Sequence, residues 1–210
     1  MDGESSRMLL CDIGNTSYHF YDLQNDYKKD VECFDPSSIE EDVYYICVNP
    51  TLKERLRSLS NWHDLEERID RTNYYDTMGI DRIVACEAVQ NGVIVDAGSA
   101  VTVDVVRDGI FAGGFIYPGV RAFQGAYASI SKTLDVELRF DTDLRKLPKS
   151  THDALAYGFL SPLLKEISSY DMDIFLTGGD AKIIQKYLPH AKRDDLLLFR
   201  GMLLLVGKQL

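Results

Sequence analysis

The sequence predicts an α/β protein built from two duplicated lobes, and three observations carry this prediction. The stretch LLCDIGNTSYHF, which begins at Leu9, reads as a strand, an aspartate, a small turn and a second strand. The stretch VIVDAGSAVTVDV, which begins at Val93, repeats this scheme. The two aspartates stand at positions 12 and 96, a spacing of 84 residues, as expected of two similar halves. Helical patterns follow each hairpin, so we predict lobes at residues 8–92 and 93–210.

Strand patterns dominate the first half. MLLCDIG and TSYHFYDL (residues 8–14 and 16–23) predict a β-hairpin, and VYYICVN (residues 43–49) predicts a buried strand that ends at an Asn-Pro pair. We expect a helix over residues 51–59. The segment DRIVACEAVQNG (residues 81–92) predicts a second helix, because apolar residues recur at helical spacing before a glycine stop.

The second half begins with another hairpin and then becomes helical. The predicted elements are a hairpin over residues 92–98 and 99–109, a third strand with a glycine turn over 110–119, helices over 120–134 and 151–170, a strand over 173–179, and then a helix, a strand and a helix. The whole chain therefore reads as β-rich, α, β-rich, α.

Composition excludes several classes of function. The chain has 210 residues, of which 45% are hydrophobic and 27% charged, and its net charge is −10. An acidic balance argues against nucleic acid as a partner, because phosphate-backbone binding needs a basic surface. The apolar stretch LLLFRGMLLLV is interrupted by Arg200 and is too short to span a bilayer. The opening MDGESSR is polar and shows no secretory signal.

Cysteine and histidine usage indicates a reducing compartment and no zinc site. Cys11, Cys33, Cys47 and Cys86 form no CxxC pair, and we interpret them as reduced core thiols of a cytoplasmic protein. The four histidines lack metal-ligand spacing.

The duplicated hairpins point to phosphate chemistry. Two such hairpins facing one cleft bring together two carboxylates and two sets of turn N–H groups, which suit phosphate oxygens and their magnesium. FLTGGDA (residues 175–181) adds a strand that ends in two glycines before a helix, a form that suits close approach of a nucleotide. Each piece alone also fits an ordinary turn, because Gly and Asn tolerate positive φ.

The motifs together resemble those of the type III pantothenate kinases. DIGNT, DAGSAVT and TGGD resemble the acetate kinase, sugar kinase, Hsp70 and actin superfamily, while GIDR, GGFIYPG and THDALAYG resemble the narrower family's GxDR, GGxIxPG and TxxAxxxG elements. The resemblance implies two duplicated ribonuclease H-like lobes with an ATP cleft between them. It implies ATP-dependent phosphorylation of pantothenate to 4'-phosphopantothenate, the first step of coenzyme A biosynthesis.

The resemblance assigns the substrate side of the site to the GIDR region. It implies that Asp81 is the general base, whereas the residues alone also allow a helix N-cap. It gives Arg82 the pantothenate carboxylate, although an exposed Arg usually forms a surface ion pair. Gly79, Ile80 and Tyr75 are expected to line the substrate, and the sequence leaves open whether Tyr75 or its neighbouring tyrosine makes the contact.

The resemblance assigns the phosphate side to the turns. The expected ATP-binding residues are Asp12, Gly14, Asn15, Thr16, Gly98, Ser99, Thr102, Gly178 and Gly179. Asp12 is expected to hold Mg²⁺, with an Asx-turn as the ordinary alternative. Asp96 is expected to sit by a monovalent cation, K⁺ or NH4⁺.

Thr151 and the helix over residues 120–134 suggest a homodimer. The resemblance implies that Thr151 reaches the pantothenate of a neighbouring subunit, although it also suits the N-cap of its own helix. The apolar positions of residues 120–134 supply a face that joins two subunits. Gly113, Gly114 and Gly119 are read as a tight strand-to-helix turn that also lets substrate approach the backbone.

Two alternative functions stay open at the level of sequence. One is a non-catalytic, nucleotide-binding regulatory protein of the same fold, since fold does not fix function. The other is a kinase for another small hydroxylated acid or sugar. The retained aspartates at positions 12, 81 and 96 favour the kinase, because a binding protein needs no general base.

Overall fold

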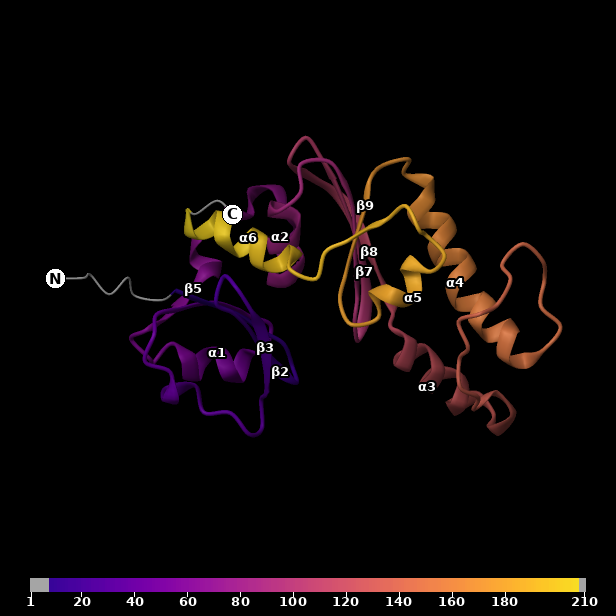
Figure 1. Cartoon of the computed structure of the whole chain (residues 1–210), viewed down its shortest axis with the longest axis horizontal. Helices are drawn as coiled ribbons and strands as arrows, with labels where there is room; N and C mark the ends of the chain where they lie inside the picture. The colour runs from indigo at the N-terminus through magenta and orange to yellow at the C-terminus, as the bar shows by residue number, and fades with distance from the viewer. Residues whose placement is uncertain (1–7, 208–210) are drawn as a thin grey trace. The chain divides into compact units, whose positions relative to one another are not determined.

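Two five-stranded sheets carry the fold (Figure 1). This computed structural model describes residues 8–207. The segment MDGESSR, in which we expect no secretory signal, and residues 208–210 lie outside the described part. Within the described residues, no helix is both long enough and apolar enough to cross a membrane.

The first sheet lies in the N-terminal half of the chain. Its elements and their neighbours are β1 (Leu9–Ile13), β2 (Ser17–Tyr21), β3 (Asp26–Asp30), the 3-10 helix η1 (Pro36–Ser38), β4 (Val43–Cys47), α1 (Pro50–Leu56), β5 (Trp62–Asp64), η2 (Leu65–Arg68), η3 (Arg71–Asn73) and α2 (Ile80–Glu87). The second sheet and its helices comprise β6 (Gly92–Ala97), β7 (Ala100–Arg107), β8 (Ile110–Pro118), α3 (Val120–Ile130), η4 (Lys132–Leu134), α4 (Thr151–Ser169), β9 (Ile174–Thr177), α5 (Ala181–Gln185), β10 (Lys192–Arg193) and the last helix, α6 (Leu197–Val206).

The two sheets have the same topology, which confirms the duplication read from the sequence. Their strand orders are β3-β2-β1-β4-β5 and β8-β7-β6-β9-β10. In each sheet the first three strands pair antiparallel, and the next two strands run parallel to the first. The aspartate of each hairpin occupies the same place in its sheet, one residue before the end of the first strand. The protein is therefore an α/β protein with a repeated strand plan.

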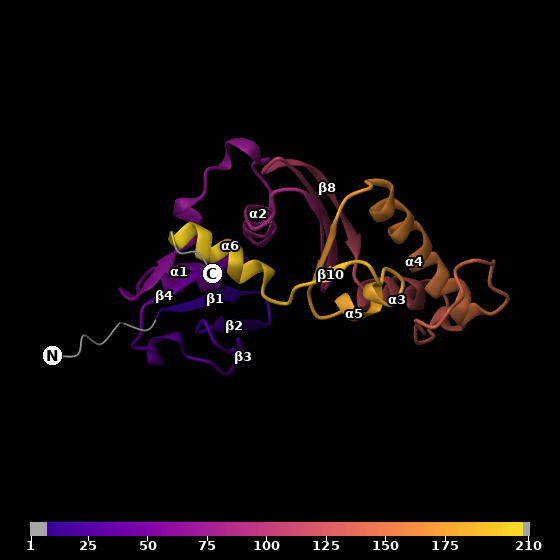
Figure 2. The ribbon, with the colours of Figure 1, turned by 45° about the horizontal axis from the view of Figure 1, so that its top comes forward.

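Helices cover both faces of the first sheet. Alternate residues of a strand point to opposite faces. Cys11 and Tyr45 pack with Leu56 of α1 on one face, whereas Leu10 packs with Met202 of α6 and with α2 on the other. Figures 1 and 2 both show α2 and α6 side by side.

An ion-pair network ties α1 to the 3-10 helices. The Lys53 ammonium contacts the Glu66 carboxylate and lies 3.2 Å from Asp64 Oδ2. Arg71 Nη2 lies 2.6 Å from the other oxygen of Glu66. Burial raises the pKa of Glu66, but the two cations outweigh burial and hold that pKa below its usual 4.5.

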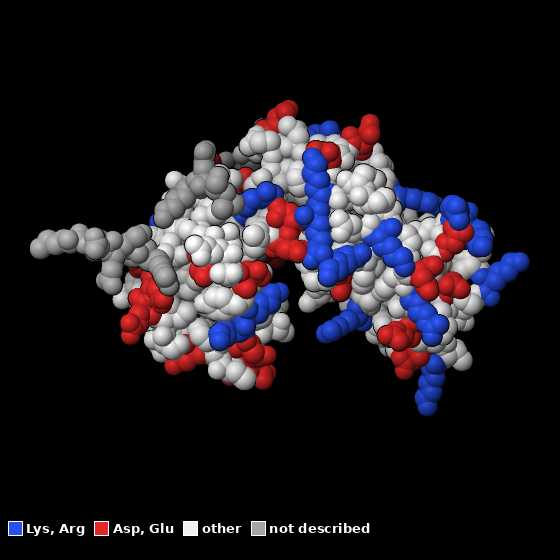
Figure 3. Space-filling view, in the orientation of Figure 1, with Lys and Arg blue, Asp and Glu red and all other residues white. Residues whose placement is uncertain are grey.

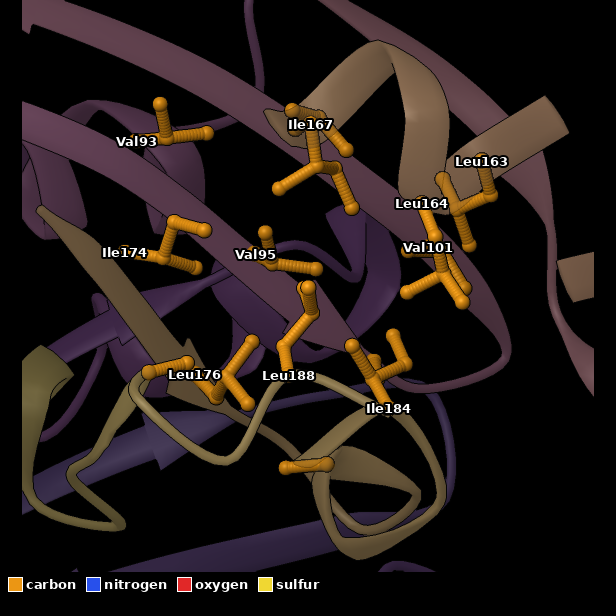
Figure 4. Close-up of a cluster of buried hydrophobic side chains, with 14 of the residues drawn as sticks. Val93, Val95, Val101, Leu163, Leu164, Ile167, Ile174, Leu176, Ile184 and Leu188 are labelled. Atoms are coloured by element: carbon orange, nitrogen blue, oxygen red, sulfur yellow. The ribbon is translucent and has the colours of Figure 1, made fainter. Parts of the chain in front are cut away.

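The helices α4 and α5 pack on one face of the second sheet. Figure 4 shows side chains of this core, among them Val95 of β6, Ile167 of α4 and Ile184 of α5. The other face of β6 and β7 carries the polar residues of the second hairpin, because alternation places Asp96 opposite to Val95. One face of the sheet therefore packs on α4 and α5, and the other carries Asp96 and Thr102 beside the buried Ile94 and Asp104.

A tyrosine hydroxyl replaces a backbone hydrogen bond that α4 lacks. Pro162 lies inside the helix and has no N–H to give to the carbonyl of Gly158 four residues earlier. The Tyr117 hydroxyl of β8 donates to the carbonyls of Gly158 and Phe159, at 3.4 and 3.2 Å. Tyr117 thus joins the end of β8 to the middle of α4.

The described chain forms two compact units, residues 8–88 with 196–207 and residues 89–195. We expected residues 93–210 to form one lobe, but α6 groups with the first unit. Apolar residues of α6, such as Phe199 and Leu203, join the cluster of Leu10 and Ile46. Gly201 allows this packing, since a Cβ at this position would lie 2.0 Å from the carbonyl oxygen of Val84 in α2.

Most predicted elements are present, with a few differences. Both hairpins, the buried strand at β4, the strand at β9 and the helices at α1 to α4 are confirmed. The sequence pattern missed β3, whose five residues are all exposed, and the three-residue β5. Cys33 is exposed, so the interpretation as a core thiol holds only for Cys11, Cys47 and Cys86. Burial raises the pKa of the Cys11 and Cys47 thiols.

Candidate functional site

Asp12 is a polar residue on an otherwise apolar sheet face. It lies on the same face of β1 as Leu10, which packs with α2 and α6. Its cross-strand neighbour on β2 is His19. His19 Nε2 lies 2.8 Å from Asp26 Oδ2 of β3, and burial lowers the pKa of His19 more than this hydrogen bond raises it. A carboxylate and an imidazole thus stand next to each other beneath the helices.

The turn after Asp12 presents two side chains to solvent. The Gly14 N–H donates to the Ser17 carbonyl at 3.0 Å and closes the turn. The Val31 N–H donates to the Thr16 carbonyl at 3.0 Å and fixes its tip. Asn15 and Thr16 are exposed on this held backbone. Their geometry suits donation to a phosphate, and their role stays a prediction.

Asp81 lies in the first turn of α2 and is not its N-cap. The N-cap residue is Gly79, and Ile80 begins the helix with its side chain buried. Oδ1 of Asp81 accepts the N–H of Arg82 at 2.9 Å. A Cβ on Gly79 would lie 2.5 Å from this oxygen, so glycine leaves the room that the carboxylate occupies. The N-cap alternative for Asp81 is therefore wrong.

Arg82 is buried and is joined to Tyr75. Its Nη1 donates to the Tyr75 hydroxyl at 2.5 Å, and its guanidinium lies 5.8 Å from the centre of that ring. Tyr75 is 44% exposed, whereas Arg82 is 6% exposed. The hydroxyl of Tyr74 donates instead to Glu87 of α2 at 2.7 Å. Tyr75 therefore contacts the guanidinium directly, and Arg82 is buried rather than at the surface.

The second hairpin repeats the geometry of the first. Asp96 of β6 stands opposite Thr102 of β7 and Thr177 of β9, so the three side chains share one sheet face. The Gly98 N–H donates to the Ala100 carbonyl at 2.9 Å and closes the turn. Ser99 at its tip is exposed. Thr177 had no predicted role, although the parallel pairing of the DAG and TGG strands is the signal that places it beside Asp96.

The TGG turn lies directly against Asp96. Gly178 has a φ of +88°, in the left-handed region that favours glycine. A Cβ on Gly178 would lie 2.3 Å from Asp96 Oδ1 and 2.5 Å from the Ala97 carbonyl oxygen. The Asp180 N–H donates to that carbonyl at 2.9 Å. Gly179 has no such neighbour and is exposed, so the two glycines serve different purposes.

The turn after β8 packs on the second hairpin, but two of its predicted glycines lie elsewhere. A Cβ on Gly119 would lie 2.4 Å from the carbonyl oxygens of both Gly98 and Ser99. Gly113 and Gly114 do not belong to this turn, because they lie inside β8, opposite β7. Gly113 has a φ of +133° near an irregular register, which explains glycine there by backbone shape.

Thr151 is the first residue of α4 and is exposed. The N-cap is Ser150, whose hydroxyl accepts the N–H of Asp153 at 3.2 Å. The capping alternative for Thr151 is therefore wrong. Its threonine hydroxyl is left for solvent or a ligand.

The structure thus brings Asp96, Gly98, Ser99, Thr102 and Gly178 together in the second unit. In the first unit it places Asp81, Arg82 and Tyr75 on α2 and the segment before it, and Asp12 on the sheet face that α2 covers. Across residues 8–207, no three His, Cys, Asp or Glu side chains are grouped as a metal site. Magnesium in phosphoryl-transfer enzymes usually has one or two protein carboxylates and otherwise phosphate and water, so a single carboxylate such as Asp12 fits it.

The family model and the sequence relatives name one family. A family model described as type III pantothenate kinase matches residues 61–170. A type III pantothenate kinase of Sulfurimonas denitrificans is 55% identical over 195 residues, which cover 93% of this chain and 95% of the relative. A crystal structure from Campylobacter jejuni is described as a conserved putative Baf family transcriptional activator. It is 36% identical to this chain and has a TM-score of 0.85. The match covers 95% of this chain and 97% of the other. MreB 5 of Spiroplasma citri bound to AMPPNP, 11% identical with a TM-score of 0.50 over 96% of both chains, shares the fold alone.

Proposed function

Since the chain belongs to the type III pantothenate kinase family, its reaction is the phosphorylation of pantothenate in coenzyme A biosynthesis, and we propose that Asp81 is the general base. The observation that carries the proposal is the place of Asp81, a partly exposed carboxylate in the first turn of α2, two residues after the N-cap residue Gly79. Gly79 leaves room for this carboxylate, because a Cβ there would lie 2.5 Å from Asp81 Oδ1.

Asp81 acts by accepting one proton. The primary hydroxyl of pantothenate attacks the γ-phosphorus of ATP, its O–P bond forms, and the bond from that phosphorus to ADP breaks. The hydroxyl proton passes to the Asp81 carboxylate. Phosphoryl transfer asks little more of a protein than such placement and neutralisation of charge.

Arg82 and Tyr75 recognise the other end of pantothenate. A guanidinium fork matches a carboxylate in geometry and charge. The hydrogen bond to Tyr75 holds the Arg82 fork in place, and the exposed Tyr75 ring would contact the bound pantothenate. The GIDR segment then supplies both the base and the anchor, which sets their spacing along one helical turn.

The two hairpin turns bind ATP. Gly14, Asn15 and Thr16 offer donors from the first unit, and the exposed Gly179 and Ser99 offer them from the second. Thr102 shares the sheet face of Asp96 and completes the second set.

Two cations fit the donors that the chain presents. Asp12 would hold Mg²⁺, which neutralises charge on the phosphates when bound. Asp96 Oδ1 and the Ala97 carbonyl oxygen lie together against Gly178. Carboxylate and carbonyl oxygens suit K⁺ or NH4⁺, and we assign Asp96 to a monovalent cation.

A homodimer explains the exposed surface of α3. This helix has apolar residues at helical spacing, yet none of its residues is buried, and Ile130 is 70% exposed. A second copy of the chain would cover this face and bring Thr151 to the partner's pantothenate. We also propose a cytoplasmic location, in keeping with its free, buried thiols.

The test is an ADP-release assay with purified protein, ATP and pantothenate. Asp81→Asn should lose about 10²- to 10⁴-fold in rate while nucleotide binding stays nearly intact. Asp12→Asn should instead raise the magnesium requirement. Asp76→Asn, an exposed aspartate of the preceding loop, is the matched control and should keep full activity. Unchanged turnover in Asp81→Asn would remove the base from the mechanism.

Two further measurements address the acceptor, the cation and the dimer. The ADP-release assay with a panel of sugars and small acids in place of pantothenate tests which compound accepts the phosphoryl group. Rates should rise in potassium or ammonium over sodium, and Asp96→Asn should lose this response. Light scattering should give a dimer, and a fully active monomer would contradict the assignment of Thr151.

A further inference from the structure

The segment that carries Tyr75 has no regular secondary structure of its own. Residues 74–79, which we call the Tyr75 loop, lie between the end of η3 and the start of α2 and form neither helix nor strand. Residues 75–77 are exposed, whereas Met78 is 3% exposed. An exposed loop samples many conformations unless other groups hold its backbone. The position of Tyr75 therefore depends on what holds this loop.

The guanidinium of Arg71 contacts the backbone of the Tyr75 loop. Arg71 is the first residue of η3, and its Nη1 donates to the carbonyls of Asp76 and Met78, each at 3.5 Å. Within the loop, the Met78 N–H donates to the Tyr75 carbonyl at 2.9 Å. A planar guanidinium offers five N–H donors in fixed directions, so one arginine can hold two carbonyls and a further acceptor. Arg71 thus fixes the half of the loop that follows Tyr75.

A carboxylate anchors the other end of the same guanidinium. Arg71 Nη2 donates to Glu66 Oε1 at 2.6 Å, and the Lys53 ammonium contacts the second oxygen of Glu66. Basic side chains lie among acidic ones on the face drawn in Figure 3, and most exposed ion pairs contribute little. The pair of Arg71 and Glu66 differs from these, because its side chains are only 33% and 30% exposed and its arginine also holds loop backbone.

The Tyr75 loop in turn sets the side chain of Arg82. The Tyr75 hydroxyl accepts Nη1 of Arg82 at 2.5 Å, and the Tyr75 ring centre lies 5.8 Å from that guanidinium. Arg82 is 6% exposed and belongs to the rigid helix α2, whereas Tyr75 is 44% exposed and belongs to the loop. A displaced loop would therefore remove a hydrogen-bond partner from the Arg82 fork. The contacts of Arg71 continue through Tyr75 to Arg82.

We propose that Arg71 is a positioning residue for pantothenate binding. Its guanidinium holds the Tyr75 loop so that the Tyr75 hydroxyl stands against Arg82, and the Arg82 fork is set for the pantothenate carboxylate before the substrate arrives. A site ordered in advance binds more tightly, because less conformational freedom is lost on binding. The inference rests on the proposed role of Arg82 as the anchor for pantothenate. Arg71 acts through the loop and makes no contact with substrate.

The experiment measures ADP release by the full-length protein while pantothenate and ATP are varied in turn. Arg71→Met should raise the KM for pantothenate about 10-fold, the effect of losing one hydrogen bond of a charged group. The kcat and the KM for ATP should change less than about 2-fold, because only binding of pantothenate is weakened. Arg71→Lys keeps the charge beside Glu66 but lacks the planar fork, so it should keep the stability of the parent protein and still raise this KM about 3-fold or more.

Lys53→Met is the matched control, since Lys53 binds the same Glu66 carboxylate from α1. Its KM for pantothenate should stay within about 2-fold of the parent protein, whatever happens to stability. Tyr75→Phe tests the route of the effect. If Arg71 acts through the Tyr75 hydroxyl, Arg71→Met should raise the KM less in Tyr75→Phe than in the parent protein. Fully additive effects of the two changes would overturn the inference.

Amide hydrogen exchange of the Tyr75 loop gives a readout that does not depend on catalysis. Exchange should be faster in Arg71→Met than in the parent protein or in Lys53→Met. Unchanged exchange in Arg71→Met would overturn the inference, as would an unchanged KM for pantothenate in this variant when Arg82→Met raises that KM. An unchanged KM in Arg82→Met would instead contradict the proposed role of Arg82, and with it the inference that rests on it.

Discussion

Alanine at Gly178 is expected to damage the second unit before any ligand is added. The backbone of Gly178 has a φ of +88°, where an L side chain costs about 1–2 kcal/mol. The new Cβ also meets Asp96 Oδ1 at 2.3 Å and the Ala97 carbonyl oxygen at 2.5 Å. The latter is backbone, so the turn must move, at a cost of about 1–3 kcal/mol. We therefore expect Gly178→Ala to lower the free energy of unfolding by about 2–5 kcal/mol.

Gly179→Ala provides the comparison. Nothing lies within 4 Å of a Cβ at this neighbour, and its φ is ordinary. Its stability in urea unfolding should stay within about 0.5 kcal/mol of the parent protein. If the proposed ATP site is right, this variant raises the KM for ATP while stability is kept. Equal stability of Gly178→Ala and Gly179→Ala would refute the reasoning from backbone geometry.

Three further changes test the packing. Tyr117→Phe should cost about 1 kcal/mol in urea unfolding, because the Gly158 carbonyl loses its donor; no change would mean that water replaces the hydroxyl. Gly201→Ala should cost more than about 2 kcal/mol, since the Cβ would lie 2.0 Å from the Val84 carbonyl oxygen, and protease sensitivity should appear in α6. Stability should fall as pH drops below about 4.5, because the lowered pKa of Glu66 stabilises the fold only while its carboxylate is ionised. Unfolding at pH 7 and pH 3 should show a smaller difference in Glu66→Gln, and an unchanged difference would exclude this residue as a cause.

The duplicated hairpins could be predicted from sequence because their signal is local. Alternation and a D-x-G turn fix each hairpin within about a dozen residues, and the repeat of the scheme fixes the plan. The edge strand β3 could not be found this way, because its sequence DYKKD has no apolar face. Charged edge strands protect a sheet from pairing with other chains. The charged sequence that prevents the prediction of β3 is thus the kind of sequence that suits an edge strand.

The roles of single residues depended on details that the sequence pattern does not resolve, namely helix ends and contacts between distant strands. Ser150 and Gly79 are the N-caps of α4 and α2, one residue away from Thr151 and two from Asp81, and helix ends are seldom fixed more finely by sequence. The sequence also did not predict that Gly178 of the TGG turn is closely packed whereas Gly179 is exposed. This difference arises because β9 pairs with β6, which brings the turn against Asp96.

The duplication offers an internal comparison for Asp81. α2 follows the fifth strand of the first sheet, and α6 follows the fifth strand of the second, so the two helices occupy equivalent places in the chain. α2 has Asp81 in its first turn, whereas α6 begins at Leu197 with no acidic residue there. The strand plan can therefore be built with or without a carboxylate at this point, and the capping of α2 does not need one either. The strand plan alone does not require Asp81, and its proposed role as the base predicts that the reaction does. If Asp81→Asn retains the stability of the parent protein in urea while losing turnover, this explanation holds; a loss of stability with turnover per folded molecule unchanged would return Asp81 to a structural role.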